Sequence, residues 1–91
     1  MQLGQVGQTI TEKLSKALTP HSLEVIDESH LHAGHSGARP EGETHFRVKV
    51  QSEAFLGKSL VQRHRMVNEV LAEELNGPVH ALAISASAPA S

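Results

Sequence analysis

The first apolar positions of the chain recur with the period of an amphipathic helix, which predicts a helix that ends before Pro20. Thr9 and Glu12 have the T-x-x-E spacing of a capping box, in which each side chain bonds the other residue's free backbone N–H. This box predicts a start at Thr9, while Leu3 and Val6 extend the stripe backward and leave an earlier start open. The positions that define the stripe are Ile10, Leu14, Ala17 and Leu18.

Two later segments alternate in polarity with the period of two that marks a half-buried strand. Residues 23–27 form the first, and residues 44–50 form the second. Two strands joined by one loop pair most simply as an antiparallel hairpin. In the second strand, one face carries apolar side chains and the other carries basic ones. The apolar face holds Phe46, Val48 and Val50, and the basic face holds His45, Arg47 and Lys49.

The segment between these strands, residues 28–42, contains glycine at 34, 37 and 42, a proline at 40, and few apolar residues. A loop of about 15 residues is longer than most connections, which favours a functional role over a plain turn. Its glycines make it adaptable, which suits a site that is completed when a partner arrives.

A second capping box, Ser59 with Gln62, predicts the start of the main helix after a short turn or 3₁₀ segment at residues 55–57. The helix is expected to stop at Asn76, because Gly77 can take the left-handed conformation and the proline that follows cannot continue the helix. Its apolar stripe consists of Leu60, Val67, Leu71 and Leu75, flanked by Val70.

The element order is therefore helix, strand, strand, helix, strand, with the third strand at residues 79–84. A crossover through the main helix makes the second and third strands parallel, and such a crossover is expected to be right-handed. The prediction is a small two-layer α+β domain, with the helices on one face of a three-stranded mixed sheet. We expect one domain over residues 1–91, with an ordered core at about residues 6–85 and a flexible tail at 86–91.

Composition narrows the class of protein. The net charge of −2 gives no general basic field for nucleic acid, and Phe46 and Phe55 are too few aromatic residues for a base-stacking platform. No apolar run is long enough to span a membrane and no signal peptide is recognised, so the expected location is cytoplasmic. The chain has no nucleophile elbow, Walker loop, dinucleotide fingerprint or HExxH motif, and we therefore expect no enzyme.

Histidine is the residue type that points to chemistry, because the chain has seven histidines and no cysteine. Imidazole is a common nitrogen ligand for borderline metals, so clustered histidines predict a metal or cluster site. Three of the seven lie in the long loop, and a fourth lies near the start of the main helix. Because the chain has no thiol, soft metal chemistry requires sulfur from a partner. The four histidines are His30, His32, His35 and His64.

Each of these candidates has a second interpretation. On a helical wheel His64 falls inside the apolar stripe, between Leu71 and Leu75. It is either a histidine at the edge of the core, bonded to a backbone carbonyl, or a metal ligand held on a rigid element. In an extended segment His30 and His32 face the same side and one ion, yet a polar loop rich in histidine is also consistent with plain solvation.

The basic residues form two groups, and each is either a solvated surface or a contact for an anionic partner or nucleic acid. Arg63 and Arg65 flank the helix histidine, and Arg47 and Lys49 lie on the strand. Carboxylates near the first strand are expected to neutralise the strand group across the hairpin. These carboxylates are Glu24 and Asp27.

Three stretches resemble the BolA family in sequence and in order. They are L-E-V-I-D-E-S-H at 23–30, E-T-H-F-R-V-K-V at 43–50, and the segment at 57–84. The most specific parts of the last segment are R-H-R-M-V and G-P-V-H-A-L. The match covers nearly all of residues 9–84. The resemblance implies a fold like that of type II KH domains, without their G-x-x-G clamp for nucleic acid.

The resemblance also implies a partner, because BolA-like proteins share a [2Fe–2S] cluster with a monothiol glutaredoxin. The partner's cysteine and glutathione supply two ligands and histidines supply the others, similar to Rieske-type mixed ligation. The R-H-R histidine of the family falls on His64, and its loop histidine best matches His32. Extra residues at 34–38 leave His35 as a substitute, with His30 as a further reserve. The isolated chain is expected to hold no cofactor.

Three hypotheses follow. The first is a non-enzymatic adaptor in iron–sulfur cluster trafficking or iron sensing, in a heterodimer with a monothiol glutaredoxin that Arg63 and Arg65 help to dock. The alternative is a DNA-binding transcription regulator of BolA type, in which these arginines and the strand pair Arg47 and Lys49 contact phosphates. The third is a zinc or copper carrier that uses the histidine loop alone. Without a partner, we expect a monomer or a weak homodimer.

Overall fold

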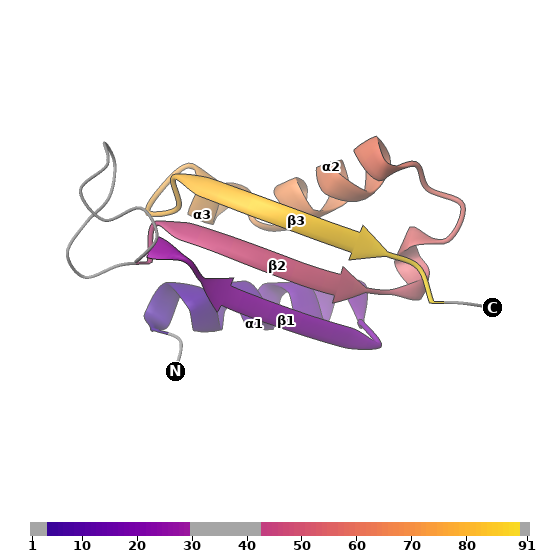
Figure 1. The fold of residues 1–91 in the computed structure, drawn as a ribbon, viewed down its shortest axis with the longest axis horizontal. Coiled ribbons are helices and arrows are strands. Elements are labelled where there is room, and N and C mark those ends of the chain that lie inside the picture. The colour runs from indigo at the N-terminus through magenta and orange to yellow at the C-terminus, as the bar shows by residue number, and fades with distance from the viewer. Residues whose placement is uncertain (1–3, 30–42, 90–91) are drawn as a thin grey trace.

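The structure, a computed structural model, describes residues 4–29 and 43–89. Three strands form a sheet, and the helices cover one of its faces (Figure 1). This is the two-layer α+β arrangement that the element order predicts. The described elements are α1 (Gln5–Leu18), β1 (Ser22–Asp27), β2 (His45–Gln51), the 3₁₀ helix η2 (Glu53–Phe55), α2 (Leu60–Val70), α3 (Ala72–Leu75) and β3 (Ala81–Ser87).

The sheet has the order β1-β2-β3, with β2 in the centre. β1 pairs with β2 antiparallel, so that Val25 lies opposite Val48, and β3 pairs with β2 parallel, so that Ile84 lies opposite Val48. Both the hairpin and the parallel crossover are therefore confirmed. The comparison with type II KH domains stays a prediction.

The core lies between the sheet and the helices. β2 turns Phe46, Val48 and Val50 inward, as its alternation predicts, and each is at most 2% exposed. η2 adds Phe55, which is fully buried. The helices contribute Ile10, Leu14, Leu18, Val67 and Leu71 to the same cluster.

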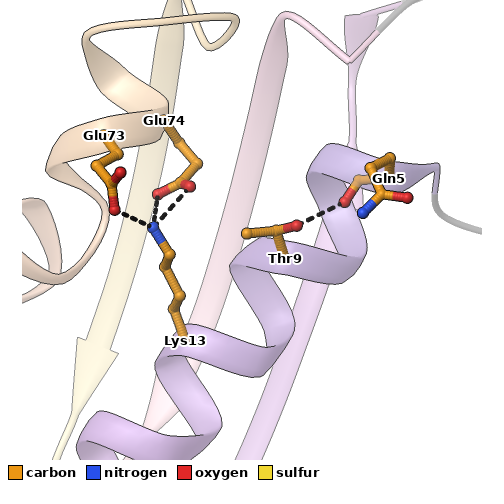
Figure 2. A network of polar contacts seen from close by, with 5 residues as sticks. All are labelled: Gln5, Thr9, Lys13, Glu73 and Glu74. Atoms are coloured by element: carbon orange, nitrogen blue, oxygen red, sulfur yellow. Dashed lines mark hydrogen bonds and ion pairs between the residues drawn. The ribbon is translucent and has the colours of Figure 1, made fainter.

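The start of α1 differs from the capping box that was predicted. The helix begins at Gln5, so Thr9 lies inside it, and its hydroxyl donates a hydrogen bond of 2.9 Å to the Gln5 carbonyl (Figure 2). The N-cap residue, Gly4, has no side chain to offer. Instead the Glu43 carboxylate accepts hydrogen bonds from the backbone N–H groups of Val6 at 2.9 Å and Gly7 at 3.4 Å.

This cap comes from a residue 37 positions away, which explains why local sequence could not reveal it. A negative charge at a helix N-terminus is favourable, because it meets free N–H groups and the positive end of the helix dipole. Gly4 leaves room for it, since a Cβ at that position would overlap the Glu43 carboxylate. The earlier helix start that Val6 left open is therefore correct, and the box at Thr9 is wrong.

The main helix starts as predicted and then departs from the prediction. The Ser59 side chain accepts from the Gln62 N–H while the Gln62 side chain accepts from the Ser59 N–H, so this capping box is confirmed. The expected single helix is interrupted at Leu71, whose φ of −103° and ψ of 20° are not helical. Leu60, predicted to be in the apolar stripe, is 65% exposed. One turn later Arg63 already contacts Ala86 near the end of β3, so Leu60 lies beyond the sheet that would cover it.

The end of this helical region is also different in detail. α3 stops at Leu75 as expected, and Asn76 caps it in a right-handed conformation. Among the described glycines the left-handed conformation belongs to Gly57, with a φ of 74°, and not to Gly77. The helix is ended by a turn in which the Val79 N–H donates to the Glu74 carbonyl at 2.9 Å.

The third strand lies later in the chain than predicted. It runs over Ala81–Ser87 instead of residues 79–84, so the flexible tail predicted from residue 86 is wrong at its first two positions. Ala86 is 7% exposed and packs in the core, while Ser85 and Ser87 are exposed. Alternating small and polar residues suit a strand with one open face, although the same composition predicts a flexible tail.

An ion-pair cluster joins the two helical segments. Lys13 of α1 contacts Glu73 at 3.0 Å and Glu74 at 2.8 Å, both on α3 (Figure 2). The hydrogen bonds that Lys13 donates to Glu74 and Glu73 raise the pKa of its ammonium above the usual 10.5. This contact fixes α3 against α1 although α3 has only four residues.

Candidate metal centre

The two ends of the long loop are bound to each other at one edge of the sheet. Asp27 accepts hydrogen bonds from the N–H of Ser29 at 2.9 Å and from the N–H of Glu43 at 3.2 Å. The Ser29 hydroxyl accepts from the N–H of Thr44 at 2.9 Å and of His45 at 3.1 Å, and Ser29 is only 6% exposed. The chain therefore leaves β1 and enters β2 at a rigid, fully hydrogen-bonded point.

This end of the sheet, where β2 and β3 start, brings together two histidines that lie far apart in the sequence. We call it the histidine edge. The rings of His45 and His80 stack with their centroids 6.3 Å apart and their planes 12° from parallel. His80 is fixed there because its N–H donates to the Thr44 carbonyl at 2.7 Å. The His45 ring is held by a contact of 2.8 Å between its Nδ1 and the Thr44 hydroxyl. His45 is partly buried, whereas His80 is exposed.

This pair is an incomplete donor set for a metal. Metal–imidazole bonds are about 2.0–2.1 Å long, whereas the ring centroids of this pair are 6.3 Å apart. Within residues 4–29 and 43–89, no three histidine, aspartate or glutamate side chains are grouped to hold an ion. With no cysteine in the chain, a cluster at this edge requires ligands from elsewhere.

His64 lies toward the opposite end of the molecule. Its neighbour Arg63 donates from Nη1 to the Ala86 carbonyl at 3.3 Å, and Ala86 pairs with Val50. The β2–β3 register starts at Ala81, so this contact is five residues further along the sheet, or roughly 17 Å at the usual rise of a strand. Figure 1 shows α2 beginning near the end of β3 and running back toward its start.

The environment of His64 lacks the hydrogen bond to a backbone carbonyl that its core-edge interpretation expects, within the residues that the structure describes. The residue is partly buried, but its ring makes no hydrogen bond or ion pair with the part of the chain that the structure describes. The loop histidines His30, His32 and His35 lie outside the described residues. A pairing of His64 with His32 therefore stays a prediction.

The basic strand face is neutralised within the molecule. Arg47 forms an ion pair of 2.9 Å with Glu28, and Lys49 lies 3.9 Å from Glu24. The expected role of Glu24 is thus confirmed, while that of Asp27 is wrong. Asp27 pairs with Phe46 in the hairpin, so its side chain lies on the opposite face from Arg47 and bonds the backbone instead.

The two arginines beside His64 have different surroundings. Arg63 donates from Nε to the Lys58 carbonyl at 3.0 Å as well as to Ala86, so it joins the start of α2 to β3. Arg65 is exposed and lines a shallow groove on the outer side of α2. Of the predicted contact residues, Arg65 is therefore the one most available to a partner.

The sequence also matches a known family model. The model described as BolA-like protein covers residues 14–91. The chain belongs to the BolA family. It is 54% identical over 87 residues to "BolA-like protein 1" of Mus musculus, an alignment that covers 96% of this chain and 61% of that protein.

Two further relatives come from Arabidopsis thaliana. The chain is 50% identical to "SufE-like protein 1, chloroplastic/mitochondrial", over 97% of this chain and 25% of that protein. The solved structure of the BolA domain of SufE1 has a TM-score of 0.88 at 50% identity, covering 97% of this chain and 96% of the other. The chain therefore spans a quarter to about three fifths of the length of these longer relatives, and it shares the fold of their BolA domain.

The cytoplasmic location expected from composition stays a prediction. No helix in the described ranges is long and apolar enough to cross a bilayer. One of the relatives carries chloroplast and mitochondrion in its name, so family membership does not confirm a cytoplasmic location.

His80 is a histidine that sequence analysis did not include among its candidates. It lies in the G-P-V-H-A-L stretch that marks the resemblance, whereas the resemblance implies the ligand role for His64. A signal was available, because a parallel crossover puts the starts of the second and third strands at the same edge of the sheet. That edge is also where the histidine loop returns to the sheet at residue 43.

Proposed function

We propose that this BolA-family chain is a non-enzymatic adaptor in iron–sulfur cluster trafficking or iron sensing, and that it forms a heterodimer with a monothiol glutaredoxin. The two proteins would share a [2Fe–2S] cluster, with thiolates from the glutaredoxin and glutathione. The observation that supports this most is the pair of histidines, His45 and His80, at the edge of the sheet to which the histidine-rich loop is attached.

The donor chemistry fits such a shared cluster. A chain without cysteine offers no thiolate ligand, and imidazole suits iron–sulfur centres of mixed ligation. We therefore propose that this chain supplies two ligands. One is His80 at the end of the sheet, and the other is His32 of the loop, with His35 and His30 in reserve.

His64 remains the competing ligand, and its distance from the loop ends separates the two versions of the proposal. Both ends of the loop are bound at the His45 edge, while Arg63, which precedes His64 on α2, bonds the Ala86 carbonyl roughly 17 Å along the sheet from Ala81. A loop histidine that shares an ion with His80 stays close to its own anchor, whereas one that shares an ion with His64 has to cross the sheet.

The test is anaerobic reconstitution of the chain with a monothiol glutaredoxin, iron, sulfide and glutathione, followed by gel filtration and visible circular dichroism. We expect a heterodimer whose spectrum differs from that of the glutaredoxin homodimer. His80→Ala should change or abolish that spectrum, and the matched His64→Ala variant should keep it. The reverse result would move the ligand to His64, and an unchanged homodimer spectrum without a heterocomplex would reject the proposed function.

The other two hypotheses are outcomes of the same preparation. Zinc retained in stoichiometric amount by the isolated chain through dialysis would favour a metal carrier. DNA binding finds no support on the strand face, because Arg47 and Lys49 are paired with carboxylates.

A further inference from the structure

The start of α2 exposes large apolar side chains that nothing in the described structure covers. Leu56 is 53% exposed, and Leu60 and Val61 are each 65% exposed. They are the exposed large hydrophobic residues of the described ranges, and they lie within six positions of one another. Exposed apolar residues gathered at one place mark an interaction site more often than single ones do. We name the surface formed by Leu56, Lys58, Leu60, Val61 and Arg65 the α2 entry surface.

Two cations lie beside these apolar side chains, and one carboxylate, Glu69, lines the groove on the outer side of α2 without pairing with either of them. Lys58 and Arg65 form no ion pair with any residue of the described ranges. Arg63 donates to two backbone carbonyls, which leave its charge without a carboxylate partner. This differs from β2, where Arg47 and Lys49 both have acidic neighbours, and it occurs in a chain whose net charge is −2.

A groove continues the surface along the outer side of α2. It has a volume of ≈ 180 Å³ and is lined by Lys58, Gln62, Arg65, Met66 and Glu69. Small-molecule pockets are usually about 300–1,000 Å³, so this groove is too small for a typical ligand. Its size and its methionine suit one or two side chains of a partner protein.

We propose that the α2 entry surface docks a partner protein through an exposed acidic amphipathic segment. Aliphatic side chains of that segment would cover Leu60 and Val61, and its carboxylates would pair with Lys58 and Arg65. An amphipathic helix laid against a groove is a common mode of recognition with these features. The partner is recognised by charge complementarity together with apolar contact.

The number of charges argues against two other anionic partners. Proteins that bind DNA through the backbone commonly neutralise about 6–10 phosphates, whereas this surface offers two cations, Lys58 and Arg65, with Arg63 beside them. Recognition of anionic lipid commonly needs about 4–8 clustered lysines or arginines. Aliphatic side chains at the centre of the surface favour a protein over a nucleic acid, since a phosphate backbone has nothing to pack on them.

The partner is distinct from the glutaredoxin, because the surface lies far from the histidine edge. Arg63, between Val61 and Arg65, reaches Ala86 at roughly 17 Å along the sheet from the starts of β2 and β3. A segment bound there leaves His45 and His80 accessible. The surface therefore stands independently of the proposed cluster and would give an adaptor its second binding site.

The probe is a fluorescent synthetic helical peptide with leucine at positions i, i+3, i+4 and i+7 and glutamate elsewhere. Binding to the full chain is measured by fluorescence anisotropy, and the site is mapped by amide shifts in NMR. Shifts should be confined to residues 56–69. Lys58→Gln with Arg65→Gln should weaken binding about fivefold, and Leu60→Ser with Val61→Ser at least as much. Lys16→Gln, which removes an exposed helix cation elsewhere, is the control and should leave the affinity unchanged.

Several results would overturn the proposal. One is equal affinity in the Lys58/Arg65 double variant and the Lys16 control, and another is a set of shifts at the His45 edge. Tighter binding of phosphatidylserine vesicles or duplex DNA, lost in the same double variant, would assign the surface to that class instead. If the double variant also loses the glutaredoxin heterodimer, the surface belongs to that interface. A retained heterodimer with weakened peptide binding supports a separate partner.

Discussion

The two ends of the sheet use polar residues in opposite ways. At the histidine edge Asp27, Ser29 and Thr44 bond one another's backbone, and Ser29 and Thr44 are buried. At the α2 entry surface the cations and the apolar side chains are both exposed, with Leu60 at 65%. The first arrangement holds ligands in fixed positions, and the second leaves surface available for contact. Rigid support at one edge and an open surface at the other are what an adaptor with two partners requires.

The largest expected effect comes from breaking the histidine edge at Ser29. Ser29→Ala removes the hydroxyl that accepts from the N–H groups of Thr44 and His45. The loss of these hydrogen bonds should lower the free energy of unfolding by about 2–3 kcal/mol. Ser59→Ala is the matched change at the exposed end, where loss of a helix cap costs about 1 kcal/mol. Urea denaturation of both variants measures the difference. Equal losses would show that the two ends do not differ in rigidity.

The next effect concerns the carboxylate that joins the histidine edge to α1. Glu43→Ala removes the acceptor for Val6 and Gly7 and is expected to destabilise the protein by about 1–2 kcal/mol. Glu43→Gln keeps an oxygen acceptor and loses only the interaction of the charge with the helix dipole, about 0.3–1 kcal/mol. Thermal denaturation measures both, and amide exchange at Val6 and Gly7 locates the change. An alanine variant as stable as the glutamine variant would contradict the cap.

A smaller effect is the pH dependence of the Lys13 cluster, which lies between the two ends. Hydrogen bonds to Glu74 and Glu73 raise the pKa of Lys13 in the folded state. The stabilisation is therefore complete below the unfolded pKa of 10.5 and is lost as pH rises through the higher folded pKa. The stability of the wild type should approach that of Lys13→Met across this alkaline range. A constant difference between the two proteins would remove Lys13 as the titrating group.

The smallest effect is expected at the open surface. Leu60→Ser should change the free energy of unfolding by less than about 0.5 kcal/mol, because the side chain is already 65% exposed. Val67→Ala, on the same helix and fully buried, is the contrast and should cost about 1–3 kcal/mol. Chemical denaturation of both variants makes the test. A large loss in Leu60→Ser would mean that this residue supports the fold and is not kept for a partner.

Local pattern predicted most of the fold correctly. The alternation in β2, the Ser59–Gln62 box and the order of the elements each depend on neighbours in sequence, and the structure confirms all three. The errors arise where a distant group replaces the local one. Glu43 caps α1 in place of Thr9, and pairing with β2 extends β3 to Ser87, two residues into the tail predicted from residue 86.

The candidate site shows the same division. Composition predicted histidine as the ligand type and, because the chain has no thiol, predicted that a partner supplies sulfur. It did not identify which histidines meet, because that depends on how strands are paired. His45 and His80 come together through the parallel β2–β3 register, while His64, which the helical wheel favoured, lies toward the other end.

The sequence by itself determined the order of the secondary-structure elements, the mixed three-stranded sheet and the lack of thiolate ligands in this BolA-family protein, because these follow from residue type and short-range periodicity. Tertiary structure decided the cap of α1, the neutralised β2 face, the meeting of His45 with His80 and the exposure of Leu60. Each of these joins or separates residues distant in sequence. Their contacts depend on strand register and helix packing, which local pattern does not specify.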